Sequence, residues 1–289
     1  MATTFDAFLE QAWADHADRP AEVAQRLEQG YALIETPAQI APLARILAHV
    51  DGEHLARWAD GVARLERLRA HAQWHDDGEG AVVVRRLVAA LTLGGGDEPA
   101  SPMSAADRAQ AHAVAASALA AQGRRGDAIR HFRTALSAAA PGIADGDPAV
   151  RALAVTSNNL AATLEELPSR DAEETASMLD AARAAREYWA RAGGWLEIER
   201  AEYMLAKCHL AAGDAHGALA HAKECAAICE RNDAEPFEQF FAQGMLALAH
   251  RARGDSQSFA LTKSAALALY ATLAADQQRW CDSTIELLA

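Results

Sequence analysis

Cysteine and histidine side chains recur at a spacing that could hold a metal ion. His221, Cys225 and Cys229 follow one another at intervals of four residues, which places them on one face of a helix. Cys208 and His209 precede them, on the expected antiparallel partner helix. Thiolate and imidazole are preferred zinc ligands, so a metal-binding protein is one hypothesis. The competing interpretation is that Cys225 simply packs as a small apolar residue, and we favour it, with no metal bound.

Other residue patterns that could support catalysis lack the required context. His71 and His75, a second possible pair of metal ligands, lie four apart beside Trp74 but precede two aspartates, as is typical of a solvated helix end. The triple glycine at 94–96 is not followed by the lysine and helix start of a phosphate-binding loop. No nucleophile elbow occurs either. We therefore expect a non-enzymatic protein without a cofactor.

The charge balance restricts the class of partner. The 289 residues carry a formal net charge of −13, whereas binding to nucleic acid through phosphates needs a concentrated basic face. A protein or peptide partner is easier to accommodate, and we expect no nucleic-acid partner.

The chain has the features expected of a cytoplasmic protein. Residues 1–20 carry four acidic side chains and no unbroken apolar run, so they do not resemble a signal peptide or an anchor. No segment approaches the roughly 20 apolar residues that span a bilayer, so we expect no membrane contact. The four cysteines lie in helical sequence, which favours reduced thiols.

The elements that must position these side chains are repeated helices. Ala116, Ala161, Ala206 and Ala247 lie in apolar helical stretches separated by 45, 45 and 41 residues. Small residues or a phenylalanine recur 12 and 19 residues after three of them, which indicates a second helix in each unit: Ala128, Ala218, Phe259, Ala135, Cys225 and Ala266. Such pairs bury their apolar faces by stacking. The sequence therefore predicts an all-α solenoid of antiparallel helix pairs.

In the first hundred residues the apolar spacing predicts helices that do not follow the repeat. Helices are expected over residues 5–15 and 22–32, over an apolar stretch ending at Val50, from Leu55 to Leu68, and over 81–93, with a turn at Asp51 and Gly52. The glycine- and proline-rich segment 94–102 is either a linker or, as we favour, a loop within one solenoid. The expected organisation is an irregular helical region over 1–100, four helix pairs over 104–272 and a capping helix over 274–289.

Residues of about 105–272 resemble tetratricopeptide repeats. The resemblance rests on leucine followed by the marker alanine, as at Leu160, Leu205 and Leu246, on turn glycines at 123, 213 and 254, and on the series Ala128, Phe132 and Ala135. The period exceeds the family's roughly 34 residues, and Pro168 replaces one turn glycine.

The resemblance implies a right-handed superhelix whose first helices line a concave groove. Counting from each marker alanine, it places Ala113, Val114 and Ser117 on the groove in the first unit. In later units we expect the following residues to bind a partner: Asn158, Asn159, Arg200, Tyr203, Met204, Lys207, Phe241, Met245 and Arg251.

Three kinds of side chain in this set suit a peptide. The amides of Asn158 and Asn159 can both donate and accept bonds to an extended backbone, although one of them could instead tie neighbouring helices together. Arg200, Lys207 and Arg251 could hold a carboxylate, unless they pair with surface glutamates such as Glu165, Glu166 or Glu202. The aromatic and methionine side chains would form an adaptable apolar floor or pack between repeats.

The sequence thus predicts a protein-protein interaction adaptor or scaffold that binds a partner segment in its groove. A regulatory sensor for a small peptide or metabolite is the second hypothesis, and the metal-binding protein is the third.

Overall fold

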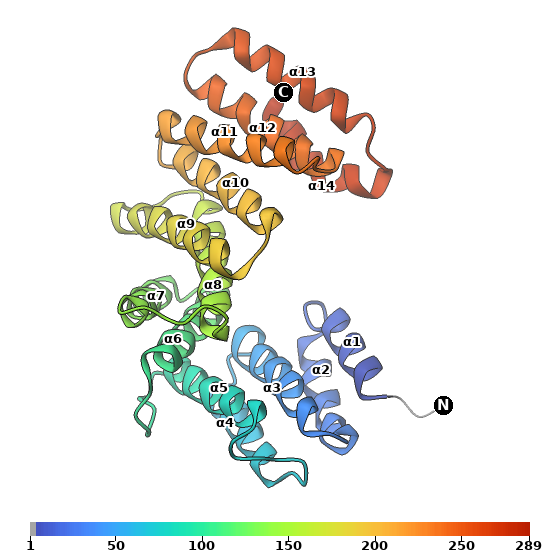
Figure 1. Cartoon of the computed structure of the whole chain (residues 1–289), viewed down its shortest axis with the longest axis vertical. Helices are drawn as coiled ribbons and strands as arrows, with labels where there is room; N and C mark the ends of the chain where they lie inside the picture. The colour runs from blue at the N-terminus through green and yellow to red at the C-terminus, as the bar shows by residue number, and fades with distance from the viewer. Residues whose placement is uncertain (1–3) are drawn as a thin grey trace. The chain divides into compact units, whose positions relative to one another are not determined.

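The computed structural model describes residues 4–289, and the fold is all-α. Within these residues there are fourteen α-helices, short 3-10 segments and one π-helical turn, with no β-strand. Contacts divide the chain into two compact units, unit 1 (Met1–Thr156) and unit 2 (Ser157–Ala289). Successive helices form antiparallel pairs within the units, as α12 and α13 do in Figure 1. The prediction of an all-α architecture built from helix pairs is confirmed.

Unit 1 begins with five helices around one apolar core. They are α1 (Phe5–Asp15), α2 (Pro20–Arg26), α3 (Ile40–Ala48), α4 (Trp58–Arg67) and α5 (Glu79–Gly95). Leu43, Ile46 and Leu47 of α3 are fully buried, and Leu65 of α4 and Val84 of α5 pack into the same core. The helical spacing of these residues in α3 thus places that helix at the centre of unit 1.

The expected turn at Asp51 and Gly52 was wrong. The chain instead continues from α3 through a π-helical turn, His49–His54. Asp51 is 1% exposed there and accepts a hydrogen bond of 2.8 Å from Arg64 of α4. The backbone at Gly52 packs so closely that a Cβ atom would lie 2.7 Å from Leu91 of α5. Tertiary packing therefore overrides the local turn preference of the Asp-Gly pair.

The segment 94–102 lies inside unit 1. The left-handed Gly96 (φ 96°) ends α5, and the hydroxyl of Ser104 caps the next helix by accepting from the Asp107 amide at 3.1 Å. The helices α6 (Ala105–Ala121) and α7 (Arg125–Ala139) follow, and α6 packs against both α5 and α7. The loop thus joins two packed helices, and the unit boundary falls further on, within α8 (Pro148–Glu165).

Unit 2 contains three of the four marker alanines, and the helix pair of the fourth, α6 and α7, lies in unit 1. After the end of α8 come α9 (Ala172–Ala192), α10 (Trp195–Ala211), α11 (Ala215–Arg231), α12 (Pro236–Ala252) and α13 (Ser256–Tyr270). Ala161, Ala206 and Ala247 are completely buried. Gly213 and Gly254 adopt φ angles of 78° and 75° between paired helices, which a residue with a Cβ atom rarely adopts.

The last helix, α14 (Ala275–Leu288), covers the first helix of the final pair. Its Cys281 and Leu288 are buried in the core that contains Met245 and Leu248 of α12. Leu261 and Leu267 of α13 remain exposed, at 66% and 40%. The helix expected to cap the array is therefore present, but it covers α12 more than the outer face of α13.

None of the helices within residues 4–289 is both long and apolar enough to cross a membrane.

Candidate functional site

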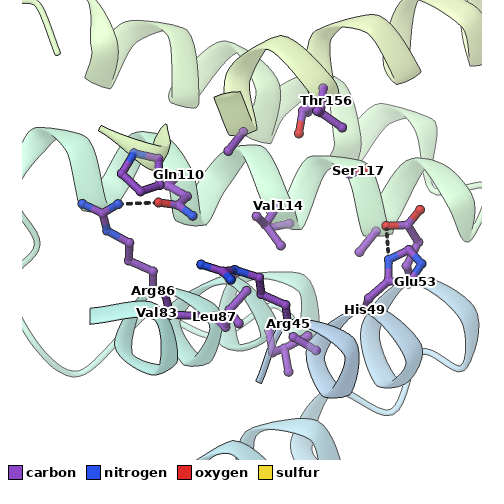
Figure 2. Close-up of a pocket in the computed structure, with 18 of the residues that line it drawn as sticks. Arg45, His49, Glu53, Val83, Arg86, Leu87, Gln110, Val114, Ser117 and Thr156 are labelled. Carbon is purple, nitrogen blue, oxygen red and sulfur yellow. Dashed lines mark hydrogen bonds and ion pairs between the residues drawn. The ribbon is translucent and has the colours of Figure 1, made fainter. Parts of the chain in front are cut away.

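Unit 1 contains a cleft of about 780 Å³, which we call the unit 1 cleft. Figure 2 shows it between α3 and the π turn, α5, α6 and the first part of α8. Its floor and walls are mainly apolar and include Val83, Leu87, Leu91, Val114 and Val155. Pockets of 300–1,000 Å³ with apolar walls and a few polar groups are typical ligand sites.

Charged side chains surround this apolar surface. The guanidinium of Arg45 donates a hydrogen bond of 3.1 Å to Glu79, and both side chains are well exposed, at 48% and 74%. In Figure 2 the Arg45 side chain extends toward the middle of the cleft. An exposed ion pair contributes only about 0–1 kcal/mol, so a carboxylate from a ligand can replace Glu79 at little cost.

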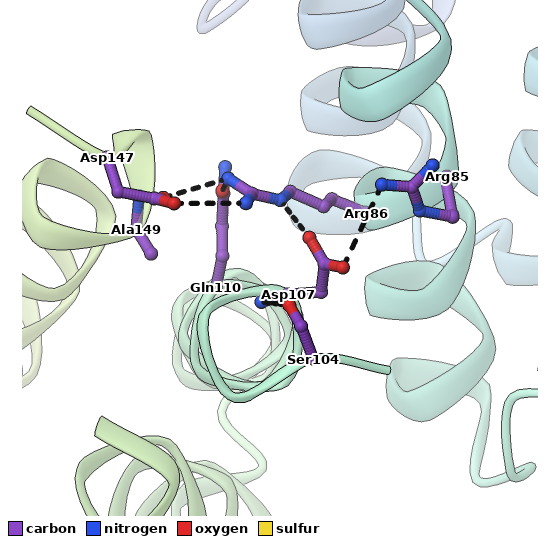
Figure 3. Close-up of polar contacts among 7 residues, drawn as sticks. All are labelled: Arg85, Arg86, Ser104, Asp107, Gln110, Asp147 and Ala149. Atoms are coloured by element: carbon purple, nitrogen blue, oxygen red, sulfur yellow. Dashed lines mark hydrogen bonds and ion pairs between the residues drawn. The ribbon is translucent and has the colours of Figure 1, made fainter. Parts of the chain in front are cut away.

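One wall is fixed by Arg86, which is 7% exposed. Figure 3 shows its guanidinium between Asp107 and Gln110 of α6 and Asp147, just before α8. Asp147 also accepts a hydrogen bond of 2.8 Å from the Ala149 amide, so it caps α8 while it binds Arg86. The arginine thus joins α5, α6 and the start of α8 in the wall of the cleft.

The Arg86 contacts favour the ionised form of Asp107. Burial opposes ionisation of Asp107, but the hydrogen bonds from Arg86 and Ser104 outweigh it and lower the pKa of this carboxyl. Burial also opposes the charge of Arg86, yet Asp147 and Asp107 raise its pKa. This network is saturated by internal bonds, so we assign it a structural role.

Histidines gather at the opposite end of the cleft. His49 lies 3.2 Å from Glu53 through Nδ1, a contact drawn in Figure 2, and 3.2 Å from His54 through Nε2. Trp13 of α1 and His16, just after α1, pack against His49 with tilted rings at centroid distances of 5.3 and 4.9 Å. Burial, together with repulsion from the neighbouring imidazoles, lowers the pKa of His54. Burial disfavours the charge of Glu53, but His49, His54 and His16 lower its pKa overall.

The cations expected to line a groove have internal partners in unit 2. Arg200 of α10 forms an ion pair with Glu238 of α12, and the ammonium of Lys207 lies 2.7 Å from Glu165. Pairing of Lys207 with Glu165 is the alternative that the sequence left open. Arg251 donates a hydrogen bond of 2.8 Å to the carbonyl of Leu287 in α14.

The expected apolar floor is largely part of a core. Tyr203 and Phe241 meet edge to face at 5.8 Å, which joins α10 to α12, and Met245 is only 2% exposed. Burial raises the pKa of Tyr203. Met204 is half-buried. On the same face of α12, the Cα of Gly244 is so close to α14 that a Cβ atom would lie 2.9 Å from Thr284. In this part of unit 2, α14 occupies the surface that the repeat resemblance assigns to a partner.

Asn158 and Asn159 are the predicted groove residues that remain available. Asn158 is half-buried and Asn159 exposed, and within residues 4–289 neither amide side chain has a hydrogen-bond partner. Neither amide ties neighbouring helices together. They stay candidates for binding.

The cysteine and histidine pattern on α10 and α11 does not converge on a common point. The Cys225 thiol donates to Glu199 at 2.8 Å, His221 lies 2.7 Å from Glu202, and His209 lies 2.9 Å from Asp214. Cys229 packs beside Cys225, and burial raises the pKa of Cys208 to about 12. Each of these groups thus has a local partner or packs in the core.

The sequence reasoning did not identify the unit 1 cleft or its histidines. Val114 and Ser117, which the repeat resemblance placed on the groove, do line the cleft. Those two positions are the signal that could have located it. Other walls come from α3 to α5, where the repeat spacing does not apply, and from α8. The histidines meet through a π turn, which an α-helical spacing rule does not predict.

Comparisons with known proteins bear only on the fold. No protein-family model matches the sequence, and no curated protein matches it. Among solved structures, the chain is similar to the crystal structure of BtubC (BKLC) from P. vanneervenii, with a TM-score of 0.52 and 16% identical residues. The match covers 93% of this chain and 92% of that chain. At this identity the similarity extends to an all-α arrangement of successive helices.

Proposed function

We propose that this protein is a non-enzymatic interaction adaptor of the tetratricopeptide-repeat type, and that the unit 1 cleft receives a segment of its partner. The observation that carries the proposal is an apolar cleft of about 780 Å³, bordered by the exposed guanidinium of Arg45. The repeat resemblance adds support, because Val114 and Ser117 lie both on its expected groove and in this cleft.

The lining indicates what the partner segment carries. An apolar side chain fits between Leu87, Val114 and Val155, where it would be removed from water. A carboxylate on the same segment would reach Arg45 and displace the exposed Glu79. We therefore propose a partner segment with an apolar anchor next to an acidic residue.

Affinity capture from the source cell with the full chain as bait tests this proposal. Ser117→Glu and Arg45→Glu place negative charge in or at the cleft, so they should reduce recovery of the partner at least tenfold. The matched control, Arg200→Ala, alters a predicted groove position of unit 2 whose side chain pairs with Glu238, and it should recover the partner normally. Circular dichroism verifies folding of each variant. Normal recovery with both cleft variants, together with loss in the unit 2 control, would place binding in unit 2 and refute the proposal.

A sensor for a small peptide or metabolite is the second candidate, because the cleft volume also suits a small ligand. Thermal unfolding in the presence of fractionated small molecules tests it. A ligand at 100 times its dissociation constant stabilises the folded protein by about 2.7 kcal/mol, and Ser117→Glu should abolish that shift.

A further inference from the structure

Three histidine side chains from separate turns of unit 1 meet at one point beside the cleft. His16 follows the last residue of α1, and His49 and His54 begin and end the π turn. One ring nitrogen of each lies within 4.8 Å of those of the other two. Among the described histidine, cysteine, aspartate and glutamate side chains, these three form the group whose ligand atoms all lie within 4.8 Å of one another.

Hydrogen bonds leave one ring nitrogen on each of two histidines, His16 and His49, free to bind a metal ion. The Nδ1 atom of His16 lies 2.5 Å from the carbonyl oxygen of Trp13. A carbonyl only accepts, so Nδ1 carries the proton and Nε2 keeps a lone pair. His49 donates from Nδ1 to the Glu53 carboxylate in the same way, at 3.2 Å. Histidine ligands of metals usually donate their other N–H to a carboxylate or a backbone carbonyl.

The spacing of the nitrogens suits a small cation. The Nε2 atoms of His49 and His54 are 3.2 Å apart. Two ligands at a Zn–N distance of about 2.0–2.1 Å in a tetrahedral arrangement lie about 3.3 Å from each other. A hydrogen bond between the two rings would explain that pair alone, but it gives no reason for the third imidazole to turn toward them.

The π turn accounts for the placement of His49 and His54. In an α-helix, residues five apart diverge around the axis, whereas the i to i+5 bonding of a π turn brings them onto one face. Such turns are frequent at functional sites. The turn is held by packing of Gly52 against Leu91 and by the Asp51–Arg64 ion pair, both on the side of the core.

We propose that His16, His49 and His54 bind one divalent transition-metal ion, with Zn²⁺ as the best match, and that Glu53 positions His49. Three imidazoles suit Zn²⁺ and its neighbours in the first transition row, whereas Ca²⁺ and Mg²⁺ require oxygen ligands. Three protein ligands leave a fourth position for water or for a carboxylate of a bound molecule. This site does not depend on the proposed adaptor function, because it is defined by the side chains of unit 1 alone.

A titration of the full, untagged chain with Zn²⁺ tests the site. The protein is first stripped with a chelator and dialysed, and binding is then measured by calorimetry with ZnCl₂ as the only ligand. We expect one equivalent of Zn²⁺ to bind, and His16→Ala or His54→Ala should weaken binding by about 100-fold or more. Glu53→Gln should weaken it about 10–100-fold, as is usual for a group that orients a metal ligand.

Two control variants separate this site from other histidines. His75→Ala removes an exposed imidazole, and His131→Ala breaks a two-histidine contact with His112. Both should bind one equivalent with the affinity of the unaltered chain. Replacing Zn²⁺ by Co²⁺ should produce the intense visible absorption of a four-coordinate ion, and His54→Ala should remove it.

The proposal is refuted if the unaltered chain takes up no stoichiometric Zn²⁺. It also fails if His16→Ala and His54→Ala, with their helices retained, bind one equivalent of Zn²⁺ as tightly as the unaltered chain. Circular dichroism of each variant shows whether the helices are retained, and the titration of the unaltered chain is decisive even if a variant does not fold.

Discussion

At the scale of single residues, Glu199 shows how burial makes stability depend on pH. It is 1% exposed in α10, and its Oε2 atom has no hydrogen-bond partner within the described part of the chain. Burial, with a contribution from the nearby Glu238, raises the pKa of Glu199 from 4.5 to about 7. The folded state therefore holds this proton more tightly than the unfolded state.

We predict that unit 2 loses stability as the pH rises from 5 to 8. The contribution of Glu199 is present near and below pH 4.5, and it is lost as the pH passes through the folded-state pKa of about 7. Between pH 5 and pH 8 the free energy of unfolding falls by about 2–3 kcal/mol for this reason, since one pKa unit corresponds to 1.36 kcal/mol. Glu199→Gln keeps the shape but cannot ionise, so it should remove this part of the pH dependence.

Urea unfolding at pH 5, 6, 7 and 8, followed by tryptophan fluorescence, measures the difference between the two proteins. Parallel stability profiles for the unaltered chain and Glu199→Gln would contradict the prediction.

Residue types in the sequence indicated which charges and thiols exist but not which groups they contact. Arg200 and Glu238 are 38 residues apart, and Cys225 and Glu199 are 26 apart. Those pairs form only when α10 packs against α11 and α12. For the same reason the sequence identifies the cations of the expected groove, but it does not predict all of their ion-pair partners.

At the scale of elements, Arg86 fixes α5 to α6 and to the start of α8. We predict that Arg86→Met lowers the free energy of unfolding by about 3 kcal/mol, because it leaves the Asp107 and Asp147 carboxylates partly buried without their cation. The neighbouring Arg85 is 48% exposed and lies 3.8 Å from Asp107. Arg85→Met should lower the free energy of unfolding by about 1 kcal/mol or less.

Chemical denaturation at neutral pH compares these two variants directly. Equal losses for Arg85→Met and Arg86→Met would show that the buried network does not hold the helices together.

The π turn offers a second test at the level of an element. In Gly52→Ala the new Cβ atom would lie 2.7 Å from Leu91 and 3.3 Å from Trp58. Either α4 and α5 move away from the π turn or the turn changes its conformation. We therefore predict that Gly52→Ala lowers the free energy of unfolding by about 1–3 kcal/mol. Gly126→Ala in α7 meets no atom within 4 Å and should be neutral or stabilising by up to about 1 kcal/mol.

Thermal unfolding of both glycine variants under one set of conditions measures the effect. A melting temperature for Gly52→Ala equal to or above that of Gly126→Ala would contradict the close packing of the π turn.

Helices were the most predictable elements, because their apolar spacing and end signals are local. The helix over 5–15 matches α1, and the repeat units yielded α6 to α13. The π turn was not predictable, since only contacts with Leu91 and Arg64, far along the chain, favour it over a turn at Asp51. The placement of α14 over Gly244 likewise depends on packing that no spacing rule encodes.

At the scale of the whole molecule, the repeats predicted the architecture better than they predicted the site. Counting from the marker alanines located Val114 and Ser117 correctly beside a cleft, but it also assigned to the groove residues of α12 that α14 covers. The regular repeats lie mostly in unit 2, whereas the walls of the cleft come both from the irregular helices before residue 100 and from α6 and α8. Regular spacing thus indicates which helices stack, and it identifies only part of the candidate site.

Site-specific photo-crosslinking in the source cell can show whether a partner binds in the unit 1 cleft. A photoreactive phenylalanine replaces either Val155, which is 37% exposed and lines the cleft, or Arg200, which is exposed in unit 2. We expect a crosslinked partner from position 155 and none from position 200. Capture of a partner from position 200 but not from position 155 would show that the partner binds outside the cleft.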